Sequence, residues 1–88
     1  GVNAKITAFI TQNQFDALVI LAFNIGLTNF ATSSVLKLVN NPSAQTKYPN
    51  LEAAWKSWNR SQGKVMQGLV NRRNAEWNMY AKNVYAHW

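Results

Sequence analysis

The sequence predicts an all-α protein: a small bundle of four to five helices that forms a single domain over residues 1–88. Apolar residues recur at helical spacing between residues 15 and 25 and again between residues 51 and 58. No alternation of apolar and polar residues is long enough to predict a strand. Because 88 residues provide only one small core, all of the helices must share it.

The first predicted elements lead into the centre of the bundle. Residues 1–10 carry few signals and are typical of the end of a helix followed by a loop. Thr11 and Gln14 then fit a capping box, in which each side chain bonds the other residue's backbone N–H. The helix that follows is apolar nearly all round, which favours a central position. We expect Gly26 to end it and residues 27–31 to form a connector.

A short helix with apolar residues between 35 and 39 comes next. Thr32, Ser33 or Ser34 can cap its start, and residues 40–43 supply turn chemistry at its end.

After a polar loop over residues 43–48, Pro49 or Asn50 can begin another helix, with one apolar stripe: Leu51, Ala54, Trp55 and Trp58. Gly63 and Gly68 are expected to bracket a loop and turn. A long final helix then runs from about Leu69 toward the C-terminus. Its predicted stripe is Val70, Trp77, Ala81, Val84 and Trp88.

Composition limits the possible functions. The net charge of +6 favours anionic partners, namely nucleic acid, acidic lipid, lipopolysaccharide or the cell wall, against the alternative of a merely solvated basic surface. With no cysteine and with His87 as the single histidine, neither a metal site nor a cofactor is expected. The longest apolar run, Ala17–Phe23, is too short to span a bilayer, and we expect no signal peptide within these residues.

Three carboxylates are available for acid–base chemistry, and each has a structural explanation. Asp16 and Glu52 are expected in first helical turns, where negative charge is favourable. Glu76 follows Arg72 by four residues and Arg73 by three, which is ion-pair spacing. Serine has no suitable histidine base here. We therefore predict no catalytic residue in this chain.

Two binding surfaces remain open from the residues alone. Basic residues interleaved with aromatic ones can bind nucleic acid by stacking, and the candidates are Trp55, Trp58, Arg60, Lys64, Arg72 and Arg73. Because Trp55 and Trp58 share one helical face, a core position is favoured for them, and no specific nucleic acid partner is predicted. The final helix could lie on an anionic membrane or pack on the bundle, with Tyr85–Trp88 beyond the core.

Three segments occur in a specific order: TQNQFDALV at residues 11–19, AFNIG at 22–26 and WNRSQGKVMQGLVNRRNAE at 58–76. Together they resemble the phage-type lysozymes, the endolysins related to the T4 and P22 phage enzymes. The resemblance implies the C-terminal helical lobe of an enzyme that hydrolyses the β-1,4 bond between N-acetylmuramic acid and N-acetylglucosamine in peptidoglycan. The catalytic glutamate of that family belongs to an N-terminal lobe. The resemblance therefore implies a complementary lobe upstream, and no acid chemistry from this chain alone.

The resemblance also implies a set of substrate-binding residues on one wall of the cleft. Phe23 and Asn24 would lie at the cleft, with Asn24 hydrogen-bonded to the glycan, and Ser33 would lie near the peptide or sugar. Ser57 and Asn59 belong to the turn that would border its mouth. The implied partner is bacterial peptidoglycan, and the implied place of action is the host cell wall or periplasm during phage lysis.

Two features depart from a minimal member of that family: the segment over residues 43–50 and the extension over Val84–Trp88. A second hypothesis is a cationic antimicrobial-type module that binds anionic envelope lipid through its basic last helix. Nucleic-acid binding is a weaker third hypothesis.

Overall fold

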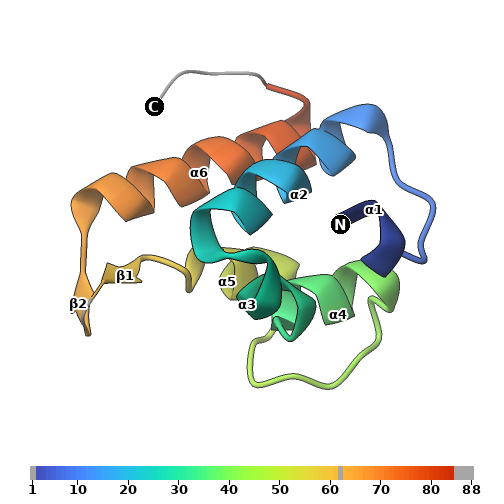
Figure 1. The fold of residues 1–88 in the computed structure, drawn as a ribbon, viewed down its shortest axis with the longest axis horizontal. Helices are drawn as coiled ribbons and strands as arrows, with labels where there is room; N and C mark the ends of the chain where they lie inside the picture. Colours follow the sequence, from blue (N-terminus) through green and yellow to red (C-terminus); the bar gives the residue numbers. More distant parts are fainter. Residues whose placement is uncertain (1, 62, 85–88) are drawn as a thin grey trace.

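The computed structural model describes residues 2–61 and 63–84, and most of them are helical. The helices are α1 (Val2–Lys5), α2 (Gln12–Ile25), α3 (Leu27–Ala31), α4 (Ser34–Asn40), α5 (Leu51–Lys56) and α6 (Gln67–Lys82). Two short strands, β1 (Arg60–Ser61) and β2 (Lys64–Val65), precede α6. Figure 1 shows α2 and α6 running side by side, with α3, α4 and α5 gathered beneath them. The all-α prediction is confirmed, with α1 as a short addition to the five longer helices.

Side-chain caps begin three of the helices at the predicted positions. The backbone N–H of Thr11 donates to Gln14 Oε1 over 2.9 Å, in the expected capping box. Ser33, and neither of its neighbours, caps α4, because its Oγ accepts from the Leu36 N–H at 3.1 Å. Asn50 caps α5 through a bond of 2.8 Å from the backbone N–H of Ala53. Each bond satisfies a donor that the first helical turn cannot pair internally.

The expectation of a connector over residues 27–31 is wrong, because these residues form α3. Gly26 ends α2 with a positive φ of 92°, a conformation open to glycine, and its carbonyl accepts from the Phe30 N–H at 2.9 Å. Phe30 is fully buried. A five-residue helix is unstable in isolation, so burial of Phe30, which local sequence does not reveal, stabilises this turn.

The chain before α6 also differs from the prediction. β1 and β2 form an antiparallel pair that matches Arg60 with Val65 and Ser61 with Lys64. Strands of two residues are too short to show an alternating pattern. Gly68, expected to bracket a turn, lies in the first turn of α6, which begins at Gln67 rather than near Leu69.

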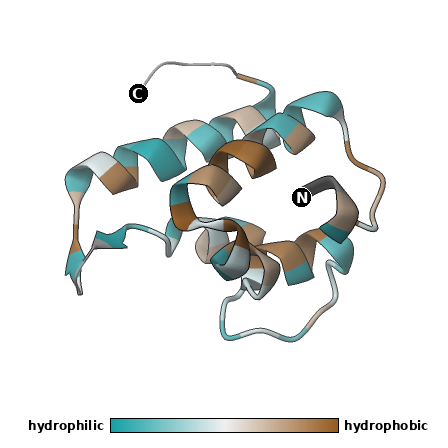
Figure 2. Ribbon diagram, in the orientation of Figure 1, coloured by the Kyte–Doolittle hydropathy of each residue, from teal (hydrophilic) through white to brown (hydrophobic). Residues whose placement is uncertain are grey.

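The core is centred on α2 and closed by the other helices. Figure 2 shows apolar residues along α2 and α4, whereas much of α6 is hydrophilic. The buried apolar residues include Ala17, Leu18 and Leu21 of α2, with Phe30, Val35, Leu38, Val39, Trp55 and Met79. The predicted stripe of α6 is wrong at Ala81 and Val84, which are exposed. Its last member, Trp88, lies outside the described residues. α6 instead turns a polar pair, Arg73 and Glu76, toward the core.

Candidate functional site

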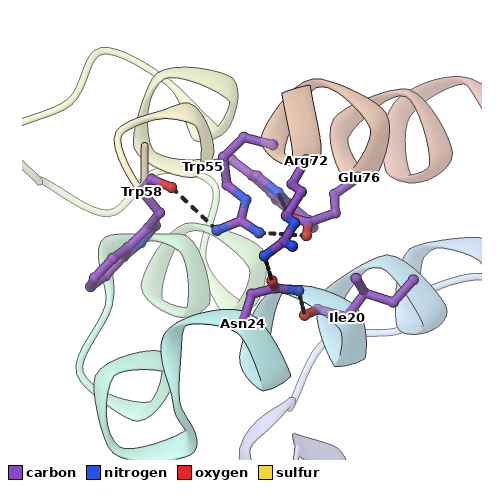
Figure 3. Close-up of polar contacts among 7 residues, drawn as sticks. Ile20, Asn24, Trp55, Trp58, Arg72 and Glu76 are labelled. Atoms are coloured by element: carbon purple, nitrogen blue, oxygen red, sulfur yellow. Dashed lines mark hydrogen bonds and ion pairs between the residues drawn. The ribbon is translucent and has the colours of Figure 1, made fainter. Parts of the chain in front are cut away.

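Two consecutive arginines at the start of α6 have opposite environments. Successive residues of an α-helix are rotated by about 100°, so the side chains of Arg72 and Arg73 cannot share a direction. Arg73 is 1% exposed, and Arg72 lies on the surface. Figure 3 shows how the side chain of Arg72 meets α2 while the neighbouring polar groups join α6 to the end of α5.

The buried arginine belongs to a network with Glu76 and Trp55. Arg73 Nη2 lies 2.7 Å from Glu76 Oε2, and Glu76 Oε1 accepts from Trp55 Nε1 at 3.1 Å. Arg73 Nη1 donates to the backbone oxygen of Trp58 at 3.2 Å. The predicted ion pair of Glu76 therefore forms with Arg73, three residues earlier. Burial raises the pKa of Glu76 above its ordinary 4.5, although Arg73 and Trp55 oppose the shift.

The exposed arginine connects α6 to the C-terminal end of α2. Arg72 Nη1 donates to Asn24 Oδ1 at 3.1 Å, and Asn24 Nδ2 donates to the Ile20 carbonyl at 2.9 Å (Figure 3). These two bonds fix the orientation of the Asn24 amide. An amide has two donor hydrogens and two acceptor lone pairs, so one of each stays available to a ligand. Phe23, the preceding residue, is 84% exposed.

A second feature is a pocket of about 350 Å³ between the α3–α4 turn, the loop before α5 and the end of α5. Two predicted substrate-binding residues, Ser33 and Ser57, line it. Ser33 Oγ donates to the Phe30 carbonyl at 2.7 Å while capping α4. Ser57 Oγ donates to the Ala54 carbonyl at 2.6 Å. We name this feature the Lys47 pocket. Its lining residues are Asn29, Thr32, Ser33, Ser34, Lys47, Tyr48, Ala54, Ser57 and Trp58.

The five residues predicted to bind substrate thus occupy three places. Phe23 and Asn24 adjoin each other on α2, and Ser33 and Ser57 meet in the Lys47 pocket. Asn59 is partly buried just before β1, where its backbone oxygen accepts from the Met66 N–H at 2.9 Å. Neither Asn59 nor the α2 pair lines the pocket.

The geometry emphasises three residues that the sequence did not assign to the substrate site: Lys47, Tyr48 and Arg72, the last of which was named only as a nucleic-acid candidate and as a possible partner of Glu76. For Arg72 the sequence held a usable signal, because only one of two adjacent arginines on a helix can be turned inward. Lys47 and Tyr48 lie in an irregular loop, where spacing gives no information about direction.

All three carboxylates occupy structural positions. Glu76 is buried, and Glu52 pairs with Lys56 at 2.7 Å in the predicted first turn of α5. Asp16 Oδ1 accepts from Gln12 Nε2 at 2.8 Å, and Asp16 lies one turn into α2 rather than in its first turn. Within residues 2–61 and 63–84, no group of three or more histidine, cysteine, aspartate or glutamate side chains could hold a metal ion.

The predicted core role of Trp55 is confirmed. Its side chain is fully buried, with ring centroids 5.7 Å from Trp77 and 5.1 Å from Tyr80, so it cannot stack on a nucleic acid base. Trp58 is only partly buried and lies beyond the end of α5, not within it as expected. None of the described helices combines the length and apolarity needed to cross a membrane. The proposed membrane contact, Tyr85–Trp88, lies outside the described residues.

The arrangement has close counterparts among known proteins. The family model for phage lysozyme matches residues 1–76. An endolysin of Bacillus phage PZA is 47% identical over 76 residues, which cover 86% of this chain and 28% of that protein. An endolysin of Bacillus phage B103 is 40% identical over 88 aligned positions, covering 96% of this chain and 32% of that protein.

A solved structure is also similar. The endolysin from Escherichia coli O157:H7 phage FAHEc1 matches with a TM-score of 0.79 and 34% identity, over 94% of this chain and 52% of that one. The chain therefore spans about a third to a half of the length of these relatives.

Proposed function

This chain belongs to the phage lysozyme family, and on that premise we propose that it forms the glycan-contacting wall of a peptidoglycan-cleaving cleft. The whole endolysin would act on the host cell wall and hydrolyse the bond between N-acetylmuramic acid and N-acetylglucosamine. The observation that carries the proposal is the exposed contact between Asn24 and Arg72, with the open ring of Phe23 beside it.

Each of these side chains suits a sugar ligand. The remaining donor and acceptor of Asn24 match sugar hydroxyl and acetamido groups. Phe23 offers an apolar surface to the C–H face of a pyranose ring, and Arg72 adds donors of fixed geometry. Ser33, Ser57 and Asn59 would contact the peptide or sugar farther along the same wall.

The catalytic acid is proposed to come from a complementary N-terminal lobe. Hydrolysis of a glycosidic bond uses two carboxyl groups that flank the bond at roughly 5 to 9 Å from each other. Here Glu76 is buried against Arg73, Glu52 pairs with Lys56, and Asp16 accepts from Gln12. We therefore expect the 88-residue chain to bind peptidoglycan without cleaving it.

Binding and cleavage can be measured on the same purified sacculi. Sedimentation should show that the chain binds, and an assay of reducing ends should show no release. Asn24→Ala should weaken binding about fivefold through loss of a hydrogen bond. Asn74→Ala, at an exposed position of the same helix as Arg72, is the matched control and should bind normally.

Two results would contradict the proposal. Equal binding by Asn24→Ala and Asn74→Ala would remove the α2–α6 contact from the glycan site. Release of reducing ends by the chain alone would mean that Asp16, Glu52 or Glu76 acts as the acid.

A further inference from the structure

We propose that the Lys47 pocket binds a free carboxylate of the peptide stem of peptidoglycan, with Lys47 as the residue that selects for charge. This inference rests on the proposed function and deepens it, because Ser33 and Ser57, which that function assigns to the peptide or sugar, line the same pocket. The chain would then bind the anionic peptide of peptidoglycan as well as its neutral sugars.

Four side chains that line the pocket carry a donor with no hydrogen-bond acceptor among the residues that the structure describes: Lys47 Nζ, Trp58 Nε1, Ser34 Oγ and the Tyr48 hydroxyl. No aspartate or glutamate lines the pocket. A recess that offers donors and one cation, and no opposing negative charge, suits an anionic acceptor. A carboxylate accepts several hydrogen bonds at once, and such bonds to a charged group are stronger than neutral ones.

The other hydroxyl groups of the pocket already have partners. Thr32 Oγ1 lies 3.3 Å from the Thr28 carbonyl, and the hydroxyls of Ser33 and Ser57 donate to backbone oxygens at 2.7 and 2.6 Å. These residues shape the wall, which leaves the four donors named above to meet a ligand.

Lys47 is held near the pocket by its own loop. Its Nζ lies 5.3 Å from the centroid of the Tyr48 ring, a cation–π distance. The Tyr48 N–H donates to Thr46 Oγ1 at 3.1 Å, and that hydroxyl lies 3.2 Å from the Tyr48 carbonyl. The loop is therefore fixed on both sides of Lys47, which limits the entropy lost when a ligand binds.

The pocket also has the size and apolar surface for part of a peptide. Its volume of about 350 Å³ lies at the small end of ligand sites. Tyr48, Ala54 and Trp58 provide apolar contact beside the donors. In peptidoglycan the sugar units carry hydroxyl and acetamido groups, whereas free carboxylates belong to the peptide stems. The charge of the pocket therefore favours the peptide.

The test compares a soluble stem tetrapeptide with the same peptide in which every carboxyl is a carboxamide. Calorimetry on the whole chain should show that the carboxamide binds at least about tenfold more weakly, because a charged hydrogen bond is lost. Lys47→Gln should remove most of that preference. Lys37→Gln, an equal change of charge at an exposed position of α4 outside the pocket, should retain it. Trp58→Phe removes one donor and should weaken the acid form more than the carboxamide, because the bond to a charged oxygen is the stronger one.

The outcomes separate this inference from the proposed function. Equal affinity for acid and carboxamide, or equal effects of Lys47→Gln and Lys37→Gln, would overturn the inference. If sugar oligomers without peptide bind and Asn24→Ala weakens them while the tetrapeptide does not bind, the proposed function stands and the inference fails. If neither sugar nor peptide binds, both are wrong.

Discussion

The contact of Arg72 with Asn24 and the contact of Arg73 with Glu76 lie one residue apart on α6 and serve opposite purposes. The Arg73 network is buried, is charged on both sides and ties α6 to Trp55 and to the backbone of Trp58. The Arg72 contact is exposed, joins a cation to a neutral amide and keeps free hydrogen-bonding capacity. The first positions parts of the fold, and the second is the contact that we propose faces a ligand.

The difference shows how burial, rather than residue type, assigns a role. A buried guanidinium without its carboxylate would carry an uncompensated charge, so Arg73 and Glu76 depend on each other. An exposed guanidinium is already solvated by water, and losing its partner has little effect on stability. Substitution of Arg73 should therefore lower the free energy of unfolding much more than substitution of Arg72, a difference that no sequence pattern reveals.

Arg73→Met is expected to have the largest effect on the free energy of unfolding. The substitution leaves Glu76 buried without its cation, and we expect the free energy of unfolding to fall by about 3 kcal/mol. Arg72→Met, the matched control, should change it by less than about 0.5 kcal/mol. Urea unfolding followed by circular dichroism measures both. Similar losses in the two variants would erase the distinction between the contacts.

Trp55→Phe tests the same network from α5. The change removes the Nε1 donor to Glu76 and leaves a small void in a fully buried position. We expect a loss of about 2 kcal/mol in unfolding free energy. Trp77→Phe, which alters a partly buried ring without a bond to Glu76, should have a smaller effect. An equal loss in both would show that ring packing alone determines the cost.

Glu76→Gln tests the charge of the network. Burial raises the pKa of Glu76 above 4.5, so the folded state binds a proton more tightly than the unfolded state. Its contribution to stability is complete below the unfolded pKa and is lost as the pH rises through the folded pKa. Glutamine keeps an acceptor and does not titrate, so the variant should lose only about 1 kcal/mol at low pH.

Thermal unfolding of the wild type and of Glu76→Gln, measured over a range of pH, tests this dependence. The quantity compared is the difference in unfolding midpoint between the two proteins at each pH. The wild type should lose stability relative to the variant as the pH rises from below 4.5. The opposite slope would mean that the ion pair with Arg73 outweighs burial.

The smallest effect on stability is expected for Asn24→Asp at the exposed contact. It places a carboxylate beside Arg72, and the resulting surface ion pair should change the free energy of unfolding by less than about 0.5 kcal/mol. Because aspartate has no N–H donor, the variant should bind glycan more weakly than the wild type. Unchanged binding to sacculi would assign the glycan contact to Phe23 or Arg72 instead.

Much of the fold could be predicted because its signals are local. Apolar spacing indicated α2 and α5, and the caps at Thr11, Ser33 and Asn50 follow from side chains that bond their own helix turn. The resemblance to phage-type lysozymes likewise followed from short motifs. α3 and the β1–β2 pair could not be predicted, because each is too short for a periodic signal and is stabilised by distant contacts or by pairing.

The candidate site was less accessible to sequence. The resemblance to phage-type lysozymes implied Phe23, Asn24, Ser33, Ser57 and Asn59 as substrate-binding residues. It did not imply that Arg72 meets Asn24 or that Lys47 and Trp58 share a pocket with the two serines. These contacts join residues far apart in the chain, such as Asn24 and Arg72, 48 positions from each other.

The sequence by itself determined the helical class, the starts of α2, α4 and α5 and the spacing that pairs Glu76 with an arginine, since all of these act within one or two turns of backbone. Only the tertiary structure decided which arginine is buried. That choice depends on the rotation of α6 against α2 and α5, which is set by burial of Trp55 and Met79 and by the carboxylate that the indole N–H and Arg73 share.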